Sequence, residues 1–277
     1  MDKPFWTSIR VNNYSLPTGY DLLPLTEELF SYLGSTNPEL RDDIAYETLA
    51  NWLDQGLYTP DQIRGYILQL TLNLQDGLGE EESDSVFLRT FSVLMLAEIV
   101  NYDGHHLFLN TDEVRNILAK GISYIEAEAD SRGYVPQKGW AHALAHTADL
   151  FLTLARHPRI QADGQTQILN AITEKLLHAT NWVYAHGEDD RLARAVSSIF
   201  ERNLLSADAI KDWLASLVTP KPNWRGAWTD EARTVAYFNV RNFLRALHLR
   251  VIQMDKLEHK AEWQSLLLEA NTNLKPN

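Results

Sequence analysis

His142, His146 and Asp149 are the residues whose types and spacing suggest chemistry. If a helix begins near Trp140, its rotation of about 100° per residue places the three side chains within about 60° of one another. The other faces of that helix carry Ala, Leu and Phe. A helix that is apolar except for one narrow polar stripe lies inside the protein, and its stripe faces a partner, a cavity or an ion. We therefore expect the functional site at this stripe.

The histidine pair is a candidate metal site. His142 and His146 lie one helical turn apart, which is the spacing that zinc-binding helices use. Ala143 stands where a metalloprotease of that type carries its glutamate base, so this class is disfavoured. Asp149 would lie about 10.5 Å along the helix axis from His142, too far for all three to share one ion without strain. A divalent metal therefore needs a carboxylate from another helix, and a metal-free pocket or a hydrogen-bonded row is the alternative.

A second group of candidates begins the predicted helix near residue 188. Glu188 and Asp189 complement the helix dipole, and Arg191 lies one turn beyond Glu188. One interpretation is a solvated helix start. In the other, this helix start points at the stripe and supplies Glu188 or Asp189 as the missing ligand or base. Arg132 and Tyr134, in the loop before the stripe, complete the candidate ligand-binding set.

Arg89 is the remaining candidate. Ser85, Arg89 and Ser92 form a polar row at helical spacing within an otherwise apolar segment. A half-buried arginine needs an anionic partner, and Asp149, Asp42 or a bound ligand would serve. The plainer interpretation is a structural ion pair between adjacent helices.

Composition limits the classes of function. The 277 residues are 45% hydrophobic and 22% charged, without a low-complexity linker, which favours a single folded domain over residues 1–277. A net charge of −12 repels nucleic acid and anionic lipid. Without cysteine, any metal must be held by histidine, carboxylate or carbonyl groups. The first residues lack an apolar targeting region, and the apolar stretch near Val93 to Val100 is interrupted by Glu98, so we expect a cytoplasmic protein without nucleic-acid or membrane partners.

Helical periodicity runs through most of the chain, and no convincing alternating strand is present. Thr59, Asn110 and Ser206 each cap a helix start that carries an acid in its first turn. These starts lie 51 and 96 residues apart, and a weaker start near Asp163 divides the second interval into 53 and 43. That spacing is typical of antiparallel helix pairs in HEAT and armadillo repeats. We expect an all-α fold of helix pairs stacked as an α-solenoid, with an irregular helical bundle as the alternative. The expected helices span 20–34, 38–54, 60–76, 83–101, 111–129, 138–156, 165–184, 188–201, 207–217, 229–253 and 258–270.

Several motifs resemble the signature of a known family. They are Arg41-Asp42, Gly79-Glu80, Asp84 to Ser92, Arg132 to Asp149, and Glu188 to Ala193. The chain resembles, over about residues 33–249, a bacterial family of uncharacterised all-helical proteins classed as a domain of unknown function. The string from Gly139 to Asp149 is the most specific part of the match. The resemblance implies an all-α repeat-like domain and no established activity.

These observations leave more than one function open. The leading hypothesis is a helical-repeat protein that binds a small ligand or a protein partner in a concave polar groove centred on His142, His146 and Asp149. The alternative is a metal-dependent or acid-base hydrolase using the same stripe, completed by Glu188 or Asp189. A third hypothesis makes the stripe purely structural. The sequence carries no dinucleotide, P-loop or nucleophile-elbow motif that would support other chemistry.

Overall fold

The computed structural model describes residues 1–178, 182–220 and 223–275, and nearly all of its regular structure is helical. The prediction of an all-α fold is confirmed. None of the helices in the described part is long and apolar enough to cross a membrane. The helical segments are α1 (Lys3–Val11), α2 (Leu22–Tyr32), η1 (Glu39–Tyr46, a π-helix), α3 (Glu47–Asp54), α4 (Pro60–Asn73), α5 (Val86–His106), α6 (Thr111–Ala127), α7 (Ala143–Arg156), α8 (Ala162–Leu177), α9 (Glu188–Arg202), α10 (Ala207–Val218), η2 (Ala227–Thr229, a 3-10 turn), α11 (Glu231–Gln253) and α12 (Lys260–Asn273).

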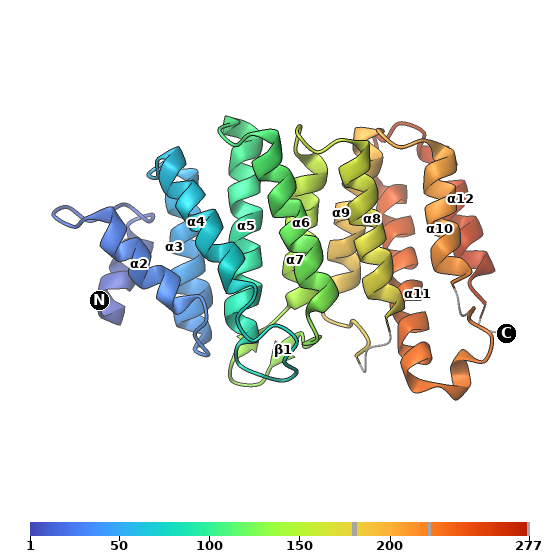
Figure 1. The fold of residues 1–277 in the computed structure, drawn as a ribbon, viewed down its shortest axis with the longest axis horizontal. Coiled ribbons are helices and arrows are strands. Elements are labelled where there is room, and N and C mark those ends of the chain that lie inside the picture. The colour runs from blue at the N-terminus through green and yellow to red at the C-terminus, as the bar shows by residue number, and fades with distance from the viewer. Residues whose placement is uncertain (179–181, 221–222, 276–277) are drawn as a thin grey trace.

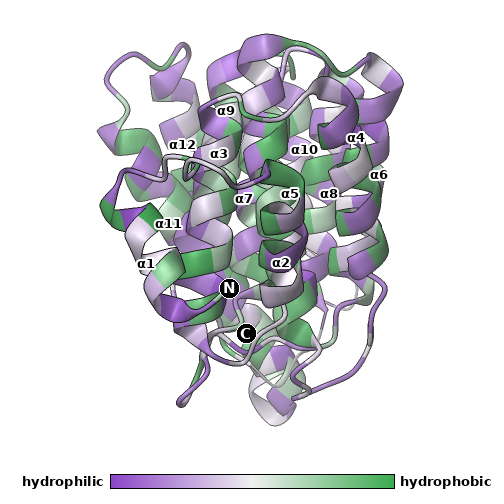
Figure 2. Cartoon of the chain, turned by 90° about the vertical axis from the view of Figure 1, so that its left-hand side faces the viewer, coloured by the Kyte–Doolittle hydropathy of each residue, from purple (hydrophilic) through white to green (hydrophobic). Residues whose placement is uncertain are grey.

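The helices from α3 onward form a row of two layers (Figure 1). In one layer α5, α7, α9 and α11 pack against one another in chain order, and in the other α6 packs against α4 and α8, and α8 against α10. Consecutive helices run antiparallel and α12 closes the row against α10 and α11. Figure 2 looks along the row and shows α4, α6, α8 and α10 on one side, with α7, α9 and α11 on the other.

Connections between consecutive helices alternate strictly in length from α3 onward. At one end of the row, which we call the short-loop end, four to six residues join the helices: 55–59, 107–110, 157–161, 203–206 and 254–259. At the other, the long-loop end at the bottom of Figure 1, ten to fifteen residues join them: 74–85, 128–142, 178–187 and 219–230. Since binding residues concentrate on loops carried by a rigid scaffold, this asymmetry selects the long-loop end as the place to look for function.

Three predicted helix starts are confirmed, and all three lie at the short-loop end. The side chain of Thr59 accepts from the backbone N–H of Gln62, and that of Asn110 from Glu113, each in a full capping box. Ser206 caps α10 in the same way without the reciprocal bond. Such caps stabilise a helix by about 1 kcal/mol each and allow the tight connections before them.

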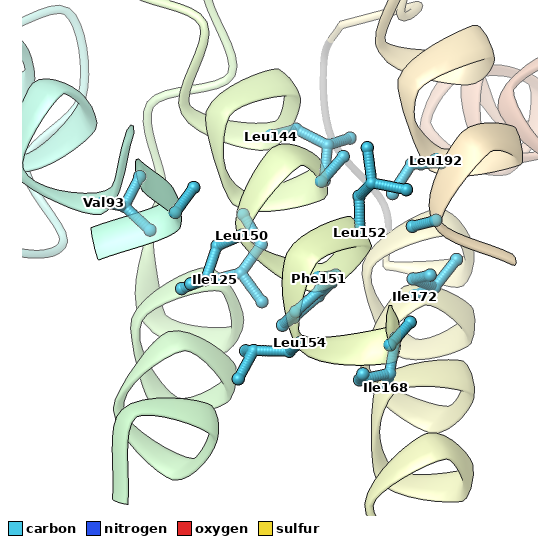
Figure 3. Packing of buried hydrophobic residues seen from close by; sticks show 14 of the residues in the cluster. Val93, Ile125, Leu144, Leu150, Phe151, Leu152, Leu154, Ile168, Ile172 and Leu192 are labelled. Atoms are coloured by element: carbon cyan, nitrogen blue, oxygen red, sulfur yellow. The ribbon is translucent and has the colours of Figure 1, made fainter. Parts of the chain in front are cut away.

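Helix α7 is the centre of the core. It packs between α5 and α9, and eleven of its fourteen residues are buried. Figure 3 shows Leu150 beside Ile125, with Phe151 and Leu154 between that side and Ile168. α6 approaches α7 closely, because a side-chain carbon on Gly121 would lie 2.9 Å from the Leu150 side chain. The close packing fixes the axis of α7, and with it the position of its first turn.

The predicted helix over 138–156 begins too early, because a short hairpin takes up its first residues. β1 (Tyr134–Val135) pairs with β2 (Gly139–Trp140) in a short antiparallel hairpin, and α7 begins only at Ala143. Gly139 and His142 both have left-handed backbone angles, with φ of 79° and 56°. These angles cannot continue a right-handed helix, so the chain turns twice before α7 starts. Helix α1 and the π-helical form of η1 were also not predicted.

Candidate functional site

A pocket of about 380 Å³ opens at the long-loop end. Its walls come from segments distant in sequence: η1 and the start of α3, one face of α5, the hairpin, and the first turns of α7 and α9. His142, His146 and His186 all line it, and we call it the histidine pocket. The remaining lining residues are the acidic and tyrosine side chains Asp42, Asp43, Tyr46 and Glu47, the apolar residues Phe91, Leu94 and Trp140, and Arg191.

His142 is the N-cap of α7, and its side chain makes no hydrogen bond to the part of the chain that the structure describes. The residue is 4% exposed, yet neither ring nitrogen has a partner among the described residues. Its ring meets Trp140 edge to face at 4.3 Å and lies 5.7 Å from the ring of His146. Burial, reinforced by the charges of Arg191 and His186, lowers the pKa of His142 to about 4. At neutral pH the ring is therefore uncharged and carries one donor and one acceptor, both unused.

His146 lies one turn further along α7 and has a fixed tautomer. Its Nδ1 is 3.1 Å from the backbone oxygen of Thr90. A carbonyl oxygen only accepts, so Nδ1 carries the proton and Nε2 carries the lone pair. Burial, with the nearby His142, lowers the pKa of His146 well below its ordinary value. The second histidine is thus also neutral, and its free nitrogen is an acceptor.

Asp149 does not line the histidine pocket. Its carboxylate forms an ion pair with Arg191 of α9 and is not part of the pocket wall. Burial raises the pKa of Asp149, while the charge of Arg191 partly opposes that rise. The structure therefore brings His142, His146 and Arg191 to one pocket and pairs Asp149 with Arg191, where it offsets the arginine charge.

Arg41 joins the hairpin to the acidic wall, which is the side of the pocket formed by Asp42, Asp43, Tyr46 and Glu47. Its guanidinium is fully buried, lies over the rings of Phe87 and Phe91 at 4.3 and 4.8 Å, and donates to the backbone oxygen of Lys138. It also pairs with Asp42 at 2.8 Å. Gly139 permits this contact, because a Cβ there would lie 3.1 Å from the Arg41 guanidinium. The opposing pocket walls are therefore joined by a buried cation.

The acidic wall is built on an unusual helix. Asp42, Asp43 and Tyr46 all belong to η1, and π-helical turns occur frequently at functional sites. The Tyr46 hydroxyl donates to Glu98 at 2.7 Å, so its oxygen keeps a lone pair for another donor. Burial raises the pKa values of Asp42 and Glu98. Asp43 and Glu47 stand exposed at the rim.

Residues 74–249 match the model of a family described as "Protein of unknown function (DUF2785)". The chain belongs to this family. No curated protein and no solved structure matches the chain. Within the chain, the DUF2785 region runs from the end of α4 through most of α11 and contains the three pocket histidines, His142, His146 and His186. The acidic wall lies before it in sequence, so the pocket combines the family domain with the preceding helices.

Arg89, also within the DUF2785 region, is not in the histidine pocket. It is fully buried and forms a two-point ion pair with Glu128, at 2.6 and 3.0 Å. It also donates to Ser85 and to the backbone oxygen of Asp76. Glu128 therefore takes the place of the expected partners, Asp149 and Asp42. The interpretation of Arg89 as part of an ion pair between neighbouring segments fits this geometry.

Arg132 and Tyr134 lie beside the pocket rather than in it. Arg132 pairs with Asp130 at 2.6 Å and donates to the backbone oxygen of Ser83, which joins two long loops. Tyr134 is 50% exposed and packs edge to face against Trp140, whose ring is 5.0 Å away. Arg132 thus supports the hairpin, and Tyr134 extends the aromatic surface of Trp140 beyond the pocket mouth.

Glu188 and Asp189 begin α9 next to the pocket without lining it. Glu188 is buried and accepts from the backbone N–H of His186 with one oxygen, while its other oxygen has no partner among the described residues. The Nδ1 of His186 is similarly unused. His186 packs closely against Gly133, because a Cβ at position 133 would lie 2.2 Å from the His186 Nδ1. Unused buried polar atoms therefore gather around the first turns of α7 and α9.

The described residues provide no complete metal site. No group of three His, Asp or Glu side chains in residues 1–178, 182–220 and 223–275 is placed to hold one ion. The sequence patterns did not identify Asp43, Tyr46, Glu47, Trp140 or His186 as site residues. The signals present were the Arg41-Asp42 motif and the position of His186 two residues before Glu188.

Proposed function

We propose that the protein binds a small polar ligand in the histidine pocket. The observation that carries this proposal is the buried side chain of His142, whose two ring nitrogens have no partner within residues 1–178, 182–220 and 223–275, on a residue with left-handed backbone angles. A buried polar group without a partner costs about 1–3 kcal/mol, and a strained backbone conformation costs a similar amount. A ligand that accepts from one nitrogen and donates to the other would offset part of this cost.

The size and lining of the pocket support the same function. Small-molecule sites commonly measure about 300–1,000 Å³ and combine apolar walls with a few converging polar groups. The histidine pocket falls in that range, with Phe91, Leu94 and Trp140 beside its polar residues.

The arrangement of the whole chain also fits a binding protein. We infer that the two-layer row of antiparallel helices is an α-solenoid and that residues 1–277 form a single domain, because one main hydrophobic cluster extends from Trp6 to Leu274. Repeat proteins commonly carry their insertions on one face, which is often the binding face. The histidine pocket lies at the long-loop end, where the longer connections gather.

An acid-base hydrolase at the same pocket is the second candidate. The fixed tautomer of His146 favours it, because Nε2 carries a lone pair that can accept a proton. An efficient general base at neutral pH has a pKa near 7, however, and the pKa of His146 lies well below its ordinary value. Binding is therefore the better supported function.

A ligand screen with a matched variant tests the proposal. Wild-type protein and His142→Asn are heated with a library of small polar metabolites, and the melting temperature is recorded. Asn accepts left-handed backbone angles, so the variant should fold. We expect at least one compound to raise the melting temperature of the wild type and of the exposed-site control His105→Asn, but not that of His142→Asn. Equal shifts in all three proteins, or no shift with any compound, would contradict the proposal.

A further inference from the structure

Building on the proposed binding function, we infer that the ligand of the histidine pocket is a small organic cation, an amine with N–H or O–H donors. The inference rests on three features of the pocket. Its arginines are already paired with carboxylates, several of its other polar groups offer only lone pairs, and a partly exposed indole ring lies on its wall.

Arginine charges near the pocket are matched by carboxylates. Arg191 pairs with Asp149, and Arg41 pairs with Asp42. Two carboxylates of the acidic wall are not matched in this way. Glu47 forms no ion pair within the described residues. Asp43 has only a contact of 3.7 Å with Arg10, in which both side chains are more than half exposed. The wall therefore carries excess negative charge, which attracts a cation and repels an anion.

Several hydrogen-bonding groups of the pocket can only accept, so they favour a ligand that carries donors. In its tautomer, His146 can only accept a hydrogen bond at Nε2. The Tyr46 hydroxyl already donates its proton to Glu98, so it too can only accept. The carboxylates of Asp43 and Glu47 accept only. His142 supplies one donor and one acceptor. An ammonium group with a neighbouring hydroxyl or second amine satisfies more of these atoms than a carboxylate or a phosphate would.

Aromatic rings at the mouth add a further contribution. Trp140 is 40% exposed, and its ring lines the pocket beside His142. Cations bind favourably over the face of an indole, with about 0.5–2 kcal/mol depending on how far the pair is removed from water. Tyr134, packed on Trp140 and half exposed, enlarges this surface.

Titration with small probes of three charge classes tests the inference. Ethanolamine and putrescine are the cations, glycerol is the neutral probe, and acetate and inorganic phosphate are the anions. Binding is followed by isothermal titration calorimetry and by tryptophan fluorescence, with Trp140→Phe used to assign the optical signal to the pocket. The proteins are wild type, the double variant Asp43→Asn/Glu47→Gln, His142→Asn, and the control Asp212→Asn, an exposed carboxylate on α10.

We expect the two amines to bind wild type and Asp212→Asn equally, to bind more weakly as salt is added, and to lose about tenfold in affinity in the double variant. Amine binding that survives intact in the double variant would overturn the inference. If glycerol, acetate or phosphate binds instead and His142→Asn abolishes that binding, the cation inference fails while the proposed ligand-binding function stands. If no probe binds, the cation inference also fails, and the metabolite screen decides the proposed function separately.

Discussion

His142 shows how a single residue can be maintained against its own contribution to stability. Its neighbour His146 is the useful comparison, because the two imidazoles lie one turn apart with similar burial. His146 donates to Thr90 and packs against Phe91. His142 has left-handed backbone angles, and its ring nitrogens have no hydrogen-bond partner among the described residues. The imidazole of His146 therefore contributes to the packing and hydrogen bonding of the fold, whereas the imidazole of His142 makes no such hydrogen bond within the described residues.

Replacing His142 should not destabilise the protein. In His142→Asn the buried imidazole is removed and the backbone angle becomes easier to adopt, so we expect the free energy of unfolding to stay the same or rise by about 1 kcal/mol. His146→Asn loses a hydrogen bond and an aromatic contact, and should cost about 1–3 kcal/mol. Urea denaturation followed by circular dichroism measures both. A loss in His142→Asn as large as in His146→Asn would show that His142 is structural.

The stability difference between wild type and His142→Asn should depend on pH. The pKa of His142 is about 4 in the folded protein against an ordinary value of 6.5. Between these values the unfolded chain binds a proton that the folded protein does not, so His142 destabilises the wild type progressively as pH falls from 6.5 to 4, by roughly 3 kcal/mol at the end of that range.

The Asn variant lacks this effect, so its advantage over wild type should grow as pH falls. The half-buried carboxyls whose pKa values are raised by desolvation, such as Asp149 and Glu98, act in the opposite sense, but both proteins contain them and their effects cancel in the difference. Parallel urea titrations between pH 7.5 and pH 4.5 provide the measurement. A difference that stays constant over that range would contradict the low pKa.

At the scale of elements, the buried pair between Arg89 of α5 and Glu128 after α6 fixes the long loops. Glu128→Gln leaves a buried arginine without its charge partner, and breaking such a pair costs about 3–5 kcal/mol. Lys138→Ala is the matched control, because the pair of Lys138 and Asp84 also joins two long loops but is solvent exposed. We expect the control to cost at most about 1 kcal/mol. Thermal melts of the two variants compare them, and equal losses would contradict a special role for Arg89.

At this scale, elements set by local interactions could be predicted from the sequence, and elements set by distant contacts could not. The caps at Thr59 and Asn110 were predictable because each is completed by a residue three positions away. The hairpin was missed because the apolar pattern around Trp140 fits a helix, and the hydrogen bond to the Lys138 backbone oxygen in its turn comes from Arg41, nearly a hundred residues earlier. The turn residues Pro136 to Gly139 were the available signal, since both Gln137 and Gly139 have positive φ.

The candidate site was predictable only in part for the same reason. His142 and His146 could be identified from their spacing, although His142 is not in the helix that the spacing assumed. Whether Asp149 faces the histidines or Arg191 depends on how α7 and α9 pack together, which no local pattern specifies. The acidic wall comes from η1, whose π-helical turns have no clear sequence signature. Partner residues from distant elements therefore required the three-dimensional structure.

At the scale of the whole molecule, stability should be greatest in the middle of the row. α7 has α5 and α9 on either side and α6 and α8 across from it, whereas α1 and α2 at one end, and α12 at the other, lack a neighbour on one side. Amide hydrogen exchange measured by mass spectrometry should show the slowest exchange in α5 and α7 and the fastest in α1, α2 and α12. Equal protection along the whole row would indicate that the protein unfolds as one cooperative unit.

The alternation of short and long connections also offers an attachment site at the end of the molecule opposite the pocket. The connection 254–259 lies at the short-loop end, and α12 after it begins without a side-chain cap that an insertion would disrupt. Extending a surface connection costs little, because loop-closure entropy grows only slowly with length. A tether or a fluorescent protein placed there would anchor every copy in the same orientation, with the histidine pocket directed away from the support.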